Sequence, residues 1–140
     1  MAREQEPDWQ PISALALIAS LIDGQLESGR EQHEKLSKAA VRRYALDDAT
    51  VQSLLRVYGD TNNDLWLYDE QLLRWTRQAL TAAQRREVQR LRNQMAALHE
   101  VITQILALAD ELKTSTIDAL LAKSDLEVGL EWLSRDDGGS

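Results

Sequence analysis

Six arginines in the second half of the chain carry the strongest chemical signal. Residues 71–99 hold these six against one glutamate, a net charge of +5, whereas the whole chain carries −7. Guanidinium groups bind phosphate oxygens, so such a cluster is a candidate nucleic-acid contact. The overall acidity and the lack of a groove-reading motif favour instead a solvated face or a mate for the acidic N-terminal residues. The nucleic-acid hypothesis rests on Arg74, Arg77, Arg85, Arg86, Arg90 and Arg92.

The two histidines, His33 and His99, are candidates for a small-ligand or metal site. Helical spacing places His33 on an apolar stripe, at about the height of His99. A di-metal carboxylate bundle needs a glutamate three residues before each histidine, but Arg30 and Ala96 occupy those positions. We therefore interpret His33 as a buried or half-buried residue that fixes helix register, and we expect no metal. The weaker alternative is a polar mid-bundle site completed by Thr61, Asn62 and Glu100.

Beyond these residues, the sequence contains no recognisable catalytic constellation. No nucleophile signature accompanies either histidine, and the chain has no glycine-rich phosphate loop. It also has no cysteine, which excludes disulfides and thiolate chemistry. We therefore expect a protein that is not an enzyme and uses no cofactor.

The N-terminal residues and the apolar runs indicate the compartment. The first ten residues are polar and acidic, unlike a secretory signal. The longest nearly unbroken apolar run, 12–22, is about half of the ~20 residues that cross a bilayer. The sequence therefore predicts a cytoplasmic protein with no membrane contact.

Three stretches with an apolar heptad pattern must position all of these side chains. In each stretch the apolar residues alternate steps of three and four, which places them on one face of a long helix. Short connections force neighbouring helices to be antiparallel. The sequence therefore predicts an all-α fold, an elongated, coiled-coil-like, up-down-up three-helix bundle. The stripes start at Ile12, Val51 and Val88 and end at Ala40, Ala79 and Leu112.

Capping residues set the expected ends of the first two helices. The first helix is predicted over 11–40, and Asp47 or Asp48 is the expected N-cap of a second over 49–79. The segment 59–64 resembles a turn when it is read locally. Because the heptad phase passes through this segment without a break, we predict a continuous helix there.

Two capping boxes mark the second half of the chain. Thr81 with Gln84 predicts a third helix that starts at residue 82 and continues to at least residue 113. Ser124 predicts a short C-terminal helix that caps the open end of the bundle. We therefore expect one domain over 11–134, a flexible acidic arm over 1–10 and a disordered tail over 135–140.

Surplus apolar residues suggest a function. Leu17 and Leu21 lie opposite the stripe of the first helix, and a second line with a spacing of seven follows the second helix. Both sets are expected at the same height, where a lone three-helix bundle cannot easily bury them, and such patches usually mark association sites. The sequence therefore predicts a protein-protein interaction or regulatory module, a homodimer or a subunit of a larger complex. The second line is Trp66, Leu73 and Leu80, and an arm carrying Trp9 could partly cover the surplus face.

Overall fold

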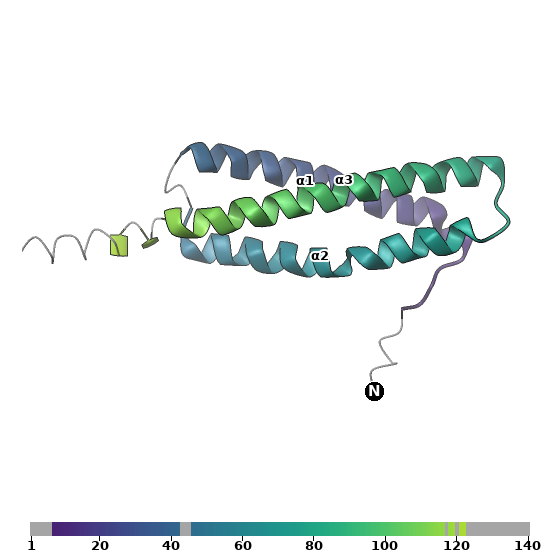
Figure 1. Ribbon diagram of the computed structural model, residues 1–140, viewed down its shortest axis with the longest axis horizontal. Coiled ribbons are helices and arrows are strands. Elements are labelled where there is room, and N and C mark those ends of the chain that lie inside the picture. Colours follow the sequence, from purple (N-terminus) through teal and green to yellow (C-terminus); the bar gives the residue numbers. More distant parts are fainter. Residues whose placement is uncertain (1–6, 43–45, 117, 120, 123–140) are drawn as a thin grey trace, which may run out of the picture.

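Three long helices build the molecule, as the computed structural model shows (Figure 1). The structure describes residues 7–42, 46–116, 118–119 and 121–122. Helix α1 spans Leu15–Val41, α2 spans Asp48–Thr76 and α3 spans Ala82–Leu112. One-turn 3-10 helices, Ile12–Ala14 and Lys113–Ser115, precede α1 and follow α3. With no strand among the described residues, the predicted all-α three-helix bundle is confirmed.

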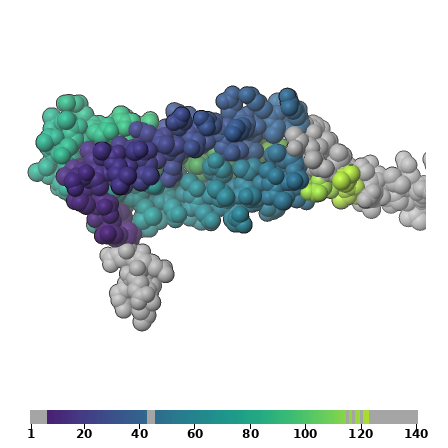
Figure 2. Space-filling view, turned by 180° about the vertical axis from the view of Figure 1, so that it is seen from behind, coloured from purple at the N-terminus to yellow at the C-terminus, as the bar shows by residue number. Residues whose placement is uncertain are grey.

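Helix α3 is the central element of the bundle. It packs along both α1 and α2, whereas α1 and α2 contact each other only sparsely. Figure 1 shows α3 crossing α1 and lying above α2, and the opposite view in Figure 2 shows α1 and α2 side by side. The bundle is therefore not equally closed on its three sides, and the side between α1 and α2 is the open one.

The predicted capping residues start α2 and α3. The Asp47 carboxylate accepts a hydrogen bond from the Thr50 backbone N–H at 2.8 Å, so Asp47 is the N-cap of α2. The Thr81 hydroxyl accepts from the Gln84 N–H at 3.1 Å, and the Gln84 side chain accepts from the Thr81 N–H at 2.9 Å. Both interactions satisfy backbone donors that have no partner within the helix.

Helix α2 continues without a break through residues 59–64, as predicted. The Thr61 hydroxyl donates to the Val57 carbonyl at 3.0 Å, a bond within the helix that keeps this polar side chain satisfied. The helix ends at Thr76 rather than at the predicted residue 79. The reason is that the chain turns at residues 77–81 to bring the Leu80 side chain into the core, where it is 9% exposed.

The core follows the three apolar stripes. Gly29 of α1 lies against α3, where an added Cβ would come within 3.1 Å of the Val101 Cγ1 atom. This glycine therefore lets the two helix backbones approach closely, which offsets the poor helix propensity of glycine. The largest fully buried side chains come from all three helices and are Ile22, Leu26, Leu36, Val51, Leu65, Leu72, Trp75, Leu91, Met95, Leu98, Ile102 and Ile105.

Residues Pro7–Gln10 are packed against α2, although the sequence suggested a flexible arm over 1–10. The Gln10 carbonyl accepts hydrogen bonds from the Trp75 indole N–H at 3.0 Å and from the Gln71 amide at 3.2 Å. In return, the Gln71 side-chain oxygen accepts from the Gln10 N–H at 2.6 Å. The buried side chains of α2 thus pair with arm backbone, as buried polar groups require. Residues 1–6 lie outside the described part.

The segment after α3 folds back onto the start of α2. The buried Thr116 hydroxyl donates to the Asp48 carboxylate at 2.5 Å, and Asp118 accepts from the Asp48 N–H at 2.8 Å. The predicted capping helix after Ser124 and the tail over 135–140 lie outside the described residues. Among the helices of the described part, none is long and apolar enough to cross a membrane.

Candidate functional site

A groove runs between α1 and α2 on the open side of the bundle. It encloses about 420 Å³, and Ile102 of α3 lies at its base. Small residues on α1 leave the groove open, since an added Cβ at Gly24 would have nothing within 4 Å. Exposed apolar side chains border it, because Leu21 is 44% and Val57 is 49% exposed. Its other lining residues are Ser20, Gln25, Ser28, Gly29, Tyr58 and Thr61.

The Gln25 side chain in this groove is only half satisfied. Its amide nitrogen donates to the Tyr68 hydroxyl at 3.0 Å, which ties α1 to α2. Its amide oxygen is buried and has no donor among the described residues. A buried acceptor without a partner is destabilising, so the Gln25 side chain is a locally unfavourable part of the groove wall.

The five residues of the predicted apolar interface do not form one surface. Leu17 and Leu21 are exposed on α1, with Leu17 at 61%. On α2, Trp66 follows Val57 by nine residues, which is half a turn away at about 100° per residue. Trp66 therefore lies on the opposite side of α2 from the groove and does not share a face with Leu17 and Leu21.

The other α2 members of that predicted interface are partly or fully covered. Leu80 belongs to the core, because α2 ends at Thr76 and the following turn points this side chain inward, and Leu73 within α2 is half-buried. Trp66 packs edge-on against Trp9, with ring centroids 6.2 Å apart and planes at 72°. The Arg74 guanidinium lies 4.3 Å from the centre of the Trp9 ring, a cation–π contact. The arm therefore occupies part of this side of α2, although Trp66 stays 52% exposed.

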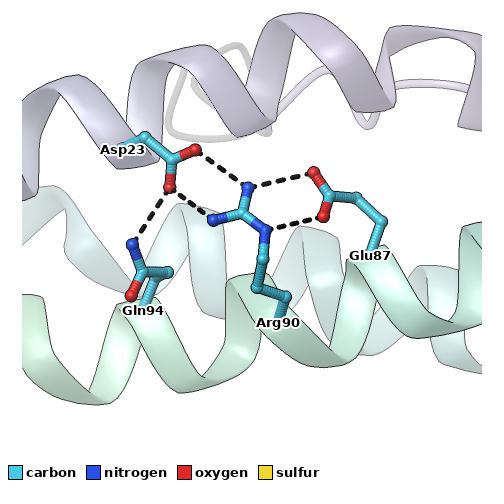
Figure 3. Close-up of polar contacts among 4 residues, drawn as sticks. All are labelled: Asp23, Glu87, Arg90 and Gln94. Atoms are coloured by element: carbon cyan, nitrogen blue, oxygen red, sulfur yellow. Dashed lines mark hydrogen bonds and ion pairs between the residues drawn. The ribbon is translucent and has the colours of Figure 1, made fainter.

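The structure divides the six predicted arginines into two groups. Arg90 donates to both carboxylate oxygens of Asp23, at 3.0 and 2.8 Å, and to Glu87 at 2.7 and 3.0 Å (Figure 3). Gln94 adds a bond to Asp23 at 3.2 Å. Arg74 pairs with Glu70 at 3.2 Å in addition to its stacking on Trp9. These two arginines thus serve internal contacts, and Arg90 joins α1 to α3.

Hydrogen bonds from Arg90 lower the pKa of both the Asp23 and the Glu87 carboxyl, and burial opposes this effect. The pKa of Arg90 is raised in turn, chiefly by its bond to Glu87 and then by its bond to Asp23. Carboxyls with a lowered folded pKa stabilise the protein above their unfolded pKa, near 4, and this contribution disappears as pH falls through the folded pKa. The groups are 34–44% exposed, so solvent screening keeps the contribution modest.

Acid is therefore expected to remove the difference in stability between the wild type and Arg90→Gln. At neutral pH the variant should unfold at a lower urea concentration, because both carboxylates lose the guanidinium and Asp23 keeps only its bond from Gln94. Below about pH 4 these carboxyls take up protons first in the unfolded state. The urea midpoints of the wild type and of Arg90→Gln should therefore converge. Urea titrations followed by circular dichroism at both pH values provide the measurement. A midpoint difference that stays constant or widens in acid would contradict the linkage.

Three of the four remaining arginines line a second cavity, of about 580 Å³, beside the turn between α2 and α3. Arg85, Arg86 and Arg92 of α3 line it, while Arg77 lies exposed in the same turn. Arg85 is also anchored, since its guanidinium donates to the Leu80 carbonyl at 2.9 Å. Of the predicted nucleic-acid residues, the fold thus brings three together in a concave site.

The two histidines lie on different sides of α3, so the mid-bundle site suggested by the sequence does not form. His33 is half-buried beside Arg30 and Glu100 on the α1 side. His99 faces α2, where its Nε2 atom is 2.6 Å from the Asp69 carboxylate. Thr61 instead lines the groove between α1 and α2. Within the described ranges, no group of three His, Asp or Glu side chains could hold a metal ion.

Sequence reasoning missed Val57 and Gln25 as groove residues. Val57 is an isolated apolar residue beside the stripe of α2, and only the separation of α1 from α2 makes it part of a surface. Gln25 gives no sequence signal, because its unpartnered oxygen depends on where Tyr68 lies. Comparison of the chain with protein-family models, with curated proteins and with solved structures gives no match. Inferences about function therefore depend on these two concave sites.

Proposed function

We propose that this protein is a non-enzymatic helical interaction module that self-associates through the groove between α1 and α2. The observation that carries the proposal is the open side of the bundle, where Leu21 and Val57 stay exposed at a hollow and Leu17 is exposed one turn before Leu21. Exposed apolar surface beside a groove is typical of protein-protein contact sites. The regular packing of α3 against both neighbours makes this the side to which a further helix can be added.

A second copy of the chain fits this groove because α1 carries both projections and a hollow. Leu17 and Leu21 project from the same helix whose small residues Ser20, Gly24 and Ser28 leave space one or two turns later. A two-fold axis would place the leucines of each copy in the hollow of the other, which is how an isologous interface becomes self-complementary.

Leu17→Ser and Leu21→Ser are expected to weaken self-association with little effect on the stability of the monomer. Both side chains are exposed in the monomer, so the substitutions remove apolar surface from the interface rather than from the core. Sedimentation velocity over a concentration series measures the dimer fraction. Leu121→Ser is the matched control, since Leu121 is 57% exposed on the segment after α3 and should leave association unchanged.

Two results would contradict the proposal. A wild type that stays monomeric at the highest attainable concentration removes self-association. Equal weakening by Leu21→Ser and Leu121→Ser would show general stickiness rather than a defined groove.

A further inference from the structure

The cavity beside the α2–α3 turn has a lining of unusual composition for an acidic chain. Among its lining residues three are arginines and none is a carboxylate. Elsewhere in the described structure, arginines of the same basic window are paired with acids, as Arg90 is with Asp23 and Glu87. Arg74 and Arg90 are thus paired with carboxylates in the structure, and the positive charge of Arg85, Arg86 and Arg92 lies at one hollow.

The arginines approach this hollow from one stripe of α3. Arg85, Gln89 and Arg92 follow one another at steps of four and three, so they share a helix face about 10 Å long. Arg86 lies beside them, and the turn adds the Gln78 side-chain amide, whereas the Thr76 hydroxyl already donates to the Leu73 carbonyl at 2.5 Å. Donors therefore converge on the cavity from two elements.

Apolar groups make up the rest of the lining. Leu80, Ala82 and Val88 contribute to the cavity, and the first and last of these are buried core residues that give it a fixed wall. A volume of about 580 Å³ falls within the usual range for sites that take small organic ligands. A ligand that combines negative charge with an apolar or planar body is therefore complementary to this lining.

We infer that this cavity binds a nucleotide unit, with the phosphate on the arginines and the base over Ala82 and beside a guanidinium plane. A phosphate group offers several oxygens to more than one guanidinium, whereas a single carboxylate is matched by one bidentate arginine. Guanidinium planes also stack on nucleic-acid bases. A free nucleotide and a nucleotide within a single strand present the same chemistry, and the experiment separates them.

This site is independent of the proposed self-association. The cavity shares no lining residue with the groove between α1 and α2. A substitution at one site can therefore be tested without altering the other.

Binding is tested with AMP and with fluorescently labelled single-stranded DNA and RNA oligomers, by calorimetry and fluorescence anisotropy over a salt series. The variant is Arg86→Gln with Arg92→Gln, which spares the anchored Arg85. The matched control is Arg42→Gln with Arg56→Gln, two exposed arginines outside the cavity, so that both variants change the net charge equally. A third variant, Ala82→Leu, fills the hollow without changing the charge.

The cavity variant is expected to bind at least about tenfold more weakly than the wild type, and the control within about twofold. For a single strand, loss of two phosphate contacts should reduce the slope of log K against log salt by about 1.4. Ala82→Leu should weaken binding of AMP or oligomer by a similar factor. Binding of AMP that competes with the oligomer would identify a nucleotide site, whereas binding of the oligomer alone would identify a strand.

Four outcomes would overturn the inference. The first is that no probe binds at low salt, and the second is that the cavity and control variants weaken binding equally. The third is that Ala82→Leu binds the probes as the wild type does. The fourth is that an acidic peptide displaces the probe as efficiently as AMP does. The last result would assign the site to carboxylate-bearing protein partners instead.

Discussion

Replacing Leu98 with alanine is expected to lower the free energy of unfolding by about 2–5 kcal/mol. Leu98 is fully buried on α3, the helix that packs against both of the others. Truncation removes apolar contacts and leaves a cavity that the flanking helices cannot fill without moving. Urea denaturation followed by circular dichroism measures the change.

The matched control is Leu121→Ala, the same substitution at a side chain that is 57% exposed and lies outside the groove. Its effect on the unfolding free energy should stay within about 0.5 kcal/mol. If Leu98→Ala were as mild as this control, α3 would not be the central packing element of the bundle.

Trp75→Ala is expected to destabilise the protein by about 3–5 kcal/mol. Trp75 is 0% exposed and is the largest of the fully buried side chains. Its indole N–H also donates to the Gln10 carbonyl at 3.0 Å, so the substitution weakens the attachment of Pro7–Gln10 as well as the core. Thermal unfolding followed by circular dichroism reports the combined loss.

Trp75→Phe separates the two contributions. Phenylalanine keeps most of the apolar contact area but has no indole N–H, so a smaller loss is expected. The Gln10 carbonyl keeps its bond from Gln71 at 3.2 Å, which limits the penalty further. If Trp75→Phe were as destabilising as Trp75→Ala, the bond to the arm rather than core packing would dominate at this position.

The sequence by itself determined the three helices and the capping residues at which α2 and α3 start. The heptad phase through 59–64 predicted that α2 is continuous, because a periodic apolar face outweighs poor local helix formers. Asp47 and the pair Thr81–Gln84 marked the starts of α2 and α3, because capping depends on bonds within three residues. A capping signal is contained in a few consecutive residues, and the heptad phase is contained in the sequence of one helix, so both can be read without knowing the tertiary structure.

The tertiary structure alone decided which surfaces exist. The spacing of seven placed Trp66 and Leu80 on one line of the second helix. In the structure, the rotation of α2 against α3 leaves Trp66 at the surface, and the turn after Thr76 brings Leu80 into the core. The same applies to charge, since no sequence pattern shows that Arg90 reaches Asp23 of another helix while Arg86 and Arg92 line a cavity. These outcomes depend on helix rotation and on contacts between residues far apart in the chain, and a period read along one helix contains neither.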